Sequence, residues 1–312
     1  MKKYTDTGKK DTRSGFGAGL LEAGRKDPRV LALTADLKGS LKMDAFAAEF
    51  PERFIQCGIA EANMVGAAAG LAISGKIPFI GSFAEFVTGR VYDQVRQEVA
   101  YGKANVKIAS SHAGITLGED GGSHQAIEDI ALMRVLPNMT VFVPSDANEC
   151  YACVEAAAKI DGPVFIRTAR LPSPVYDPLP FEVGKGIVLK EGKDGVLFTC
   201  GIMKEHALEA VDILAGQGID LSLVTFHTIK PFDEELARTF AAKYKKVFTL
   251  EEHSIIGGLG DTVASAVIGC GVEKFHKIGI QDVFGQSGKP ADLLKEYGLT
   301  GPQIAENIQN HL

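Results

Sequence analysis

The chain has 312 residues, 46% hydrophobic and 23% charged, which is ordinary for a globular protein of about two domains and argues against intrinsic disorder or a coiled coil. Asp and Glu outnumber Lys and Arg by 39 to 33, and no basic block is present, so we expect no nucleic-acid partner. With no long apolar run, no signal-peptide pattern and five scattered cysteines, the sequence predicts a cytoplasmic protein without membrane association.

The first half of the chain alternates β-branched apolar segments with segments of helical periodicity, which is typical of a parallel sheet with crossover helices. Several predicted strands are apolar on both faces, so we expect them to be buried between two helical layers. The predicted helices are 13–25, 61–74, 86–101, 126–136 and 147–159, and the predicted strands are 30–35, 53–58, 77–82, 106–111, 140–145 and 163–169.

Four of the 13 prolines lie between residues 172 and 180, too many for a helix or a central strand. We therefore expect a first domain at 1–172, a Pro-rich linker at 173–185 and a smaller domain at 186–312. In the smaller domain the predicted strands are 195–201, 220–226, 245–252 and 274–280, and the predicted helices are 203–217, 233–243 and 259–270. The fold class is α/β, with two domains that each contain a mainly parallel sheet flanked by helices.

Common cofactor and metal motifs are incomplete in this sequence. GFGAG at 15–19 lacks both a preceding strand and the G-x-G-x-x-G spacing, and no P-loop motif occurs. Cys150 and Cys153 form a C-x-x-C pair, but they lie in a predicted helix without a second ligand pair nearby. We therefore expect neutral buried cysteines there and no metal site on this chain.

Polar residues gather where predicted strands give way to helices, which is where open parallel sheets bind ligands. Glu61 starts a helix of small apolar residues, and is either a first-turn acid favoured by the helix dipole or a carboxylate held for proton chemistry. Phe83 and Phe86 are three residues apart and can share a helix face, although core packing also explains such a pair. His112 and His124 bracket the glycine-rich acidic sequence LGEDGG, which favours a binding site over scaffold.

Four segments together resemble a known family. GIAEAN (58–63), SFAEF (82–86), GEDGGSHQAIEDIALMRVLPNMTVFVPSDANE (118–149) and EEHSIIGGLG (251–260) resemble the pyrimidine-binding and C-terminal domains of transketolase, a thiamine-diphosphate enzyme. The resemblance extends from about Asp11 to the C-terminus. The same segments are similar, less closely, to deoxyxylulose-phosphate synthase and, more distantly, to the beta subunit of 2-oxoacid dehydrogenases.

The resemblance implies a chain that works with a partner. Full-length transketolases hold Mg²⁺ (or Ca²⁺) and the diphosphate of the cofactor with a G-D-G motif and a downstream Asn, and no G-D-G occurs here. We therefore expect the C-terminal subunit of a split transketolase, with the metal site on a separate N-terminal subunit and a heterotetramer as the assembly. The implied reaction, in the pentose phosphate pathway, transfers a two-carbon ketol unit from a ketose phosphate to an aldose phosphate through a thiamine-diphosphate carbanion.

The resemblance also implies roles for individual residues. Glu61 would hydrogen-bond the pyrimidine ring, Phe83 and Phe86 would stack on it, and Asp36 would lie near the cofactor. His112 and His124 join Glu61 as catalytic candidates. Sugar-phosphate contacts are implied for Arg13, Ser40, His112, Asp120, His124 and Arg170, with Arg170 preferred to Arg167. Two alternatives stay open: another thiamine-diphosphate enzyme subunit, synthase-like or dehydrogenase-beta-like, and a non-catalytic assembly module.

Overall fold

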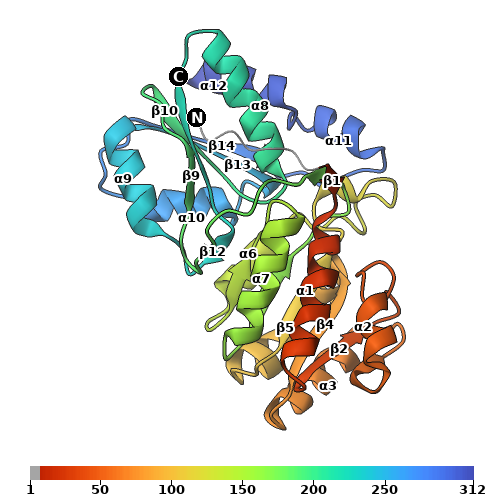
Figure 1. Ribbon diagram of the computed structural model, residues 1–312. Helices are drawn as coiled ribbons and strands as arrows, with labels where there is room; N and C mark the ends of the chain where they lie inside the picture. The colour runs from red at the N-terminus through yellow and green to blue at the C-terminus, as the bar shows by residue number, and fades with distance from the viewer. Residues whose placement is uncertain (1–7) are drawn as a thin grey trace.

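The structure is a computed structural model that describes residues 8–312; most of the charged N-terminal start lies outside these residues. The described chain forms two α/β units, of which the first is the lower and the second the upper in Figure 1. Each unit contains a mainly parallel sheet flanked by helices, which confirms the predicted fold class.

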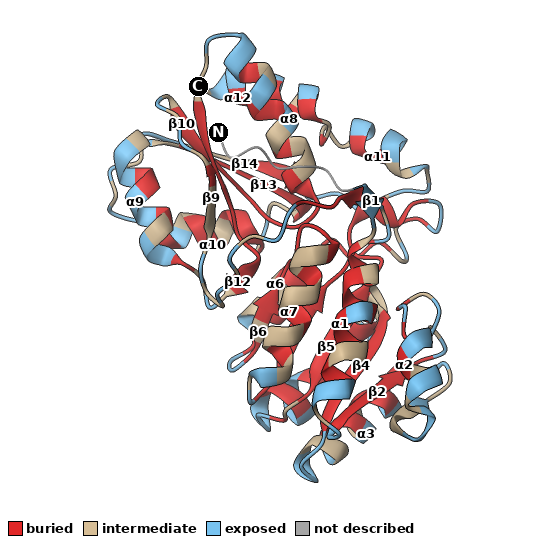
Figure 2. Ribbon diagram, viewed as in Figure 1, coloured by how far each residue is buried: buried red, intermediate tan, exposed pale blue. Residues whose placement is uncertain are grey.

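The larger sheet lies in the first unit. Over residues 8–312 it has seven strands in the order β12-β6-β7-β5-β4-β2-β3, and all but β12 run parallel. Every residue of β2, β5 and β7 is buried, as expected for strands covered on both faces (Figure 2). The parallel strands are β2 (Val30–Thr34), β3 (Phe54–Gln56), β4 (Ile77–Phe83), β5 (Lys107–Ser111), β6 (Thr140–Phe142) and β7 (Val164–Arg167).

Two helical layers cover this sheet. One layer contains α1 (Thr12–Lys26), α2 (Asp44–Glu49) and α7 (Ala147–Lys159), and η1 (Pro51–Arg53) precedes β3. The other contains α3 (Glu61–Ile73), α4 (Ala84–Thr88), α5 (Tyr92–Gln94), the π-helix η2 (Val95–Tyr101) and α6 (Asp129–Val135).

Two glycines of the GFGAG sequence have a packing role in α1. A Cβ on Gly15 would collide with the carbonyl of Ala147, and one on Gly19 would lie 2.8 Å from Val154. These glycines therefore allow α1 to lie directly against α7, as Figure 1 shows. Cys150 and Cys153 are buried in α7, and burial raises the pKa of both thiols, so they are neutral core residues as predicted.

The second unit has its own sheet. Among the described residues it has five strands in the order β14-β13-β10-β11-β9, of which the edge strand β9 is antiparallel. These strands are β9 (Ile187–Lys190), β10 (Gly195–Thr199), β11 (Leu221–Thr225), β13 (Lys246–Ser254) and β14 (Lys274–Ile280). Helices α8 (Met203–Gly216), α11 (Pro290–Glu296) and α12 (Gly301–His311) share one hydrophobic core. Helices α9 (Glu234–Tyr244) and α10 (Leu259–Ala266) pack in a second hydrophobic core, which also contains residues of the first unit.

A strand pairing connects the two units. β12 (Thr228–Lys230) follows β11 of the second unit but pairs antiparallel with β6 of the first. β1 (Lys9–Lys10) pairs with β8 (Ser173–Pro174) at the beginning of the Pro-rich segment. Apolar residues from both units also share one core cluster. The units are therefore packed as one body.

The helix predicted at 86–101 is wrong in detail. After α4 the backbone N–H groups of Gly89 and Arg90 both donate to the carbonyl of Glu85, so the hydrogen-bond register changes by one residue. The chain then restarts as α5 and the π-helix. Gly89, a weak helix former, sits at this break. The helix predicted at 126–136 begins three residues before α6, and the helix predicted at 259–270 ends four residues after α10. The sequence did not predict β1, β8, β9, β12, α2, α11 and α12.

Candidate active site

The candidate residues follow the carboxyl ends of five neighbouring strands, in the sheet order β7-β5-β4-β2-β3. Arg170 follows β7, His112 follows β5, Phe83 ends β4, Asp36 and Ser40 follow β2, and Glu61 follows β3. Because parallel strands end at the same edge of a sheet, residues far apart in the sequence meet there.

Glu61 is a buried acid with few partners. It is the first residue of α3, reached through a left-handed Gly58 with φ of 69°, and is only 4% exposed. Its carboxylate accepts long hydrogen bonds from Ser82 Oγ at 3.5 Å and from Arg90 Nη1, at 3.3 Å to each oxygen. These contacts are long for hydrogen bonds, and Arg90 is the charged partner of the acid.

Aromatic rings form a wall beside this acid. The ring centroids of Phe83 and Phe86 are 5.9 Å apart, and that of His124 is 5.1 Å from Phe86. The His112 ring lies 4.2 Å from Phe83. Arg90, which sequence analysis missed, places its guanidinium carbon 4.0 Å from the Phe86 centroid. The wall therefore joins α4, β5 and the loop that carries His124.

Positive charge gathers around His112. This residue is buried and has a left-handed backbone with φ of 60°, a strained conformation that is frequent at functional sites. Burial, followed by the charges of Arg13 and Arg170, lowers the pKa of His112 to about 3. Arg13 Nη1 lies 3.3 Å from His112 Nε2, and Ser111 Oγ lies 2.6 Å from Nδ1. Since a guanidinium only donates, Nε2 accepts and Nδ1 carries the proton.

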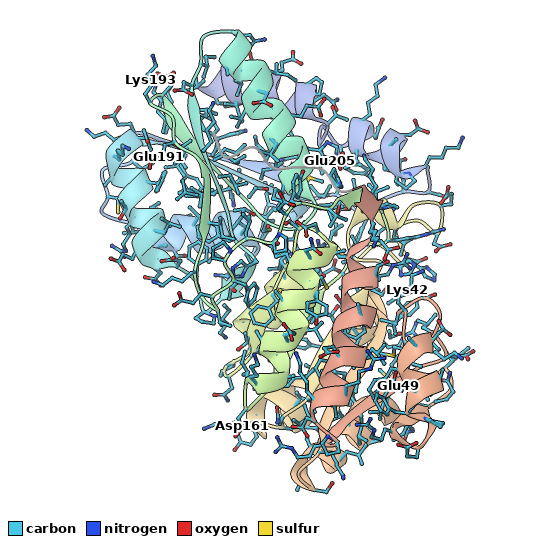
Figure 3. All side chains as sticks on the ribbon, in the orientation of Figure 1. Lys42, Glu49, Asp161, Glu191, Lys193 and Glu205 are labelled. Carbon is cyan, nitrogen blue, oxygen red and sulfur yellow. The ribbon has the colours of Figure 1, made fainter. Side chains whose placement is uncertain are left out.

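Two neighbouring groups fix the position of the Arg13 guanidinium. Asp11 caps α1 and pairs with Arg13 at 3.0 Å, while the Arg13 Nη1 also donates to the carbonyl of Ser40 at 3.0 Å. Its buried Nε has no hydrogen-bond partner within the described chain. Lys42, a second residue that sequence analysis missed, adds positive charge near His112 and lies beside α1 in Figure 3. Such a cluster suits a phosphate group.

The remaining candidates are more exposed. Asp120 lies in an exposed turn, and His124 is half-buried with Ser123 Oγ 2.9 Å from its Nδ1. Asp36 is exposed, has φ of 60°, and donates its backbone N–H to Gln56 Oε1 at 2.7 Å. Within residues 8–312, no hydrogen bond or ion pair joins the Asp36 side chain to Glu61 or to the aromatic wall.

Arg167, the last residue of β7, and Arg170, which follows this strand, have different surroundings. Arg167 is buried, donates through Nε to Asp129 at 2.8 Å, and reaches the carbonyl of Glu252 in the second unit at 2.9 Å. Arg170 is exposed and donates to the carbonyl of Leu117 at 3.1 Å. Arg167 therefore has a structural role between the units, and Arg170 is the one that solvent and ligands can reach.

Three comparisons with known proteins agree on the family. Residues 8–174 match the model for the transketolase pyrimidine binding domain, and residues 184–304 match the model for the transketolase C-terminal domain. The chain belongs to the transketolase family.

Relatives cover nearly the whole chain. It is 46% identical over 309 residues to "Putative transketolase C-terminal section" of Methanocaldococcus jannaschii, covering 97% of this chain and 96% of that one. It is 43% identical to the 6-deoxy-6-sulfo-D-fructose transketolase subunit SqwH of Clostridium sp. (91% and 89% covered). The solved structure "Split gene transketolase, inactive beta4 tetramer" superposes with a TM-score of 0.89 at 47% identity, covering 97% and 98%.

Family membership implies thiamine diphosphate and a divalent metal. The buried Glu61 beside an aromatic wall fits the edge and face of a pyrimidine ring. The donor set for a metal does not fit: across residues 8–312 no three His, Cys, Asp or Glu side chains gather closely enough to hold an ion. In the same range no helix has the length and apolar character needed to cross a membrane.

Proposed function

We propose that this chain is the C-terminal subunit of a two-chain transketolase that moves a two-carbon ketol unit from a ketose phosphate to an aldose phosphate. The observation that carries the proposal is one sheet edge with three features: a buried acid, an aromatic wall and a cation cluster. Glu61, Phe86 and His112 represent these features, and ring contacts connect the wall to the cluster.

The acid and the wall would hold the cofactor. When bound, thiamine diphosphate supplies the nucleophilic carbon that attacks a carbonyl. Glu61 would hold a proton at the pyrimidine edge, where its poor solvation favours a shared hydrogen bond over hydration. Phe83 and Phe86 would exclude water from the ring face, and Asp36 would lie nearer the partner chain.

The cation cluster would bind the sugar phosphate. Arg13 and Arg170 would supply charge. In its other neutral tautomer, with Nδ1 accepting from the Ser111 hydroxyl, His112 would donate its Nε2–H, so the three residues would hold a phosphate at one end of the substrate. Ser40 would add a polar contact. Asp120 and His124 would then orient the sugar hydroxyls nearer the aromatic wall, because His124 packs against Phe86.

We further propose that Mg²⁺ or Ca²⁺ and the diphosphate are bound by a separate N-terminal subunit, in a cytoplasmic heterotetramer with two copies of each chain. The names of two relatives support this division, since one is a transketolase C-terminal section and one a split-gene transketolase. The pathway would be the pentose phosphate pathway.

Reconstitution tests the proposal. The purified chain is assayed alone and with an N-terminal subunit that carries the G-D-G motif, using xylulose 5-phosphate and ribose 5-phosphate. We expect turnover only with both chains. Because a relative acts on 6-deoxy-6-sulfo-D-fructose, that sugar serves as a second donor. Activity of the single chain would refute the split, and no turnover of either donor by the pair would refute the transferase.

The alternatives predict other results in the same assay. A synthase-like or dehydrogenase-like subunit would consume pyruvate or another 2-oxoacid in preference to a ketose phosphate. A non-catalytic module would bind the N-terminal subunit without conferring turnover on any of these substrates.

A further inference from the structure

A segment of the second unit lies against the loop that carries Asp120 and His124. This segment, residues 284–290, connects β14 to α11, and the loop spans residues 118–125. Ser287 Oγ donates to the carbonyl of Glu119. Gln125 Nε2 donates to the carbonyl of Gln286 at 3.0 Å. The loop is therefore tied to a part of the chain more than 160 residues away.

The backbones approach so closely that glycine is required on both sides. A Cβ on Gly122 would lie 2.6 Å from the carbonyl oxygen of Gly285. A Cβ on Gly285 would overlap the Oε1 of Gln125. The clash at Gly122 involves a backbone atom, so a side chain there must separate the two segments. The clash at Gly285 involves the buried amide of Gln125, so a side chain there must displace that amide from its hydrogen bonds.

Gln125 is the central residue of this contact. Its side chain is 3% exposed, and its Nε2 also reaches the carbonyls of Ile115 and Gly118, at 3.1 and 3.3 Å. The loop has no regular structure of its own, and Gly118 and Gly121 have positive φ. Such a flexible sequence needs outside contacts to keep one conformation.

We propose that the 284–290 segment positions Asp120 and His124 for the sugar substrate, with Gln125 and Gly285 as positioning residues. This rests on the proposed function, in which those two side chains orient hydroxyl groups. A displacement of about 1 Å in such groups can cost on the order of a hundredfold in rate. The second unit thereby contributes to substrate handling as well as to assembly.

Gly285→Ala tests this in the reconstituted enzyme. The matched control is Gly216→Ala at the exposed end of α8, where an added Cβ meets nothing within 4 Å. We expect Gly285→Ala to lower kcat/KM for xylulose 5-phosphate at least tenfold, with the thiamine diphosphate affinity and Tm close to those of the control. A kcat/KM equal to that of the control, or a loss matched by lost cofactor affinity, would overturn the proposal.

A second readout needs no activity. Hydrogen–deuterium exchange of residues 118–125 in the assembled protein should be faster in Gly285→Ala than in Gly216→Ala. The pair Ser287→Ala and Ser287→Thr refines the comparison, since only threonine keeps the hydroxyl that contacts Glu119. Unchanged exchange of residues 118–125 in Gly285→Ala would refute the proposal that the 284–290 segment positions this loop, whatever the enzyme assay shows. Faster exchange in a protein that has no transketolase activity would refute the transketolase assignment and leave the positioning proposal supported.

Discussion

Arg90 Nη1 lies 3.3 Å from each carboxylate oxygen of Glu61, and the same guanidinium lies over the ring of Phe86. It therefore contacts both surfaces that we assign to the pyrimidine ring. The Glu61 side chain is 5% exposed and that of Arg90 is 50% exposed. Since a half-exposed side chain moves at low cost, Arg90 is the partner that would yield to a ligand.

Arg90→Ala is therefore expected to strengthen thiamine diphosphate binding several-fold in the reconstituted enzyme, because Glu61 and Phe86 lose a competitor. Isothermal titration calorimetry measures the dissociation constant. The exposed Arg96 provides the control variant Arg96→Ala. Weaker binding by Arg90→Ala would instead mean that Arg90 supports the ring.

Glu61→Gln should lower kcat of the reconstituted enzyme by several orders of magnitude. Glutamine keeps the shape of the side chain but cannot hold a proton between itself and a ring nitrogen as a carboxyl group does. The measurement is steady-state kinetics with xylulose 5-phosphate at saturating cofactor. A near-normal kcat would remove Glu61 from the mechanism.

His112 offers a test of the phosphate subsite. Its pKa of about 3 makes the ring neutral near pH 7, so it contributes a hydrogen bond without charge. His112→Ala should lower kcat/KM for a phosphorylated ketose by about 10- to 100-fold, the cost of one hydrogen bond to a charged group. His112→Gln should retain more, and His124→Ala should also impair this substrate. Equal losses with an unphosphorylated ketose would contradict the assignment.

Glu85 should make stability depend on pH. Burial, followed by the charges of Glu128 and Asp129, raises its pKa from 4.5 to about 7. The folded chain then binds more protons than the unfolded chain between these values, so this contribution to stability is lost as pH rises from 4.5 through about 7. Glu85→Gln should raise Tm at pH 8 but not at pH 5, relative to the exposed control Glu98→Gln. An equal change at both pH values would refute this.

The buried Arg167–Asp129 pair, which lies within the first unit, should contribute more to stability than an exposed ion pair. Asp129→Ala leaves a buried guanidinium without the carboxylate it pairs with, which should lower the free energy of unfolding by about 3–5 kcal/mol in urea titrations. The exposed pair of Lys245 and Glu273 is the control, and Glu273→Ala should cost less than about 1 kcal/mol. Similar losses for the two variants would contradict this role.

Local pattern predicted much of the fold. Parallel strands covered on both faces are mostly apolar, and β2 and the first three residues of β7 carry that pattern. The helix at Ala147–Lys159 was predicted with its observed bounds, since Asp146 is a strong N-cap that accepts from Glu149 N. The short strand β12 was missed because its partner β6 belongs to the other unit.

By itself the sequence determined the α/β architecture, the family, and candidates such as Glu61 and His112, because periodicity and motif residues are local properties. Only the tertiary structure decided that Arg90 reaches Glu61 across a change of helix register, and that Gly285 meets Gln125. Contacts between distant segments depend on how sheets and helices pack, and no spacing along the chain encodes that distance.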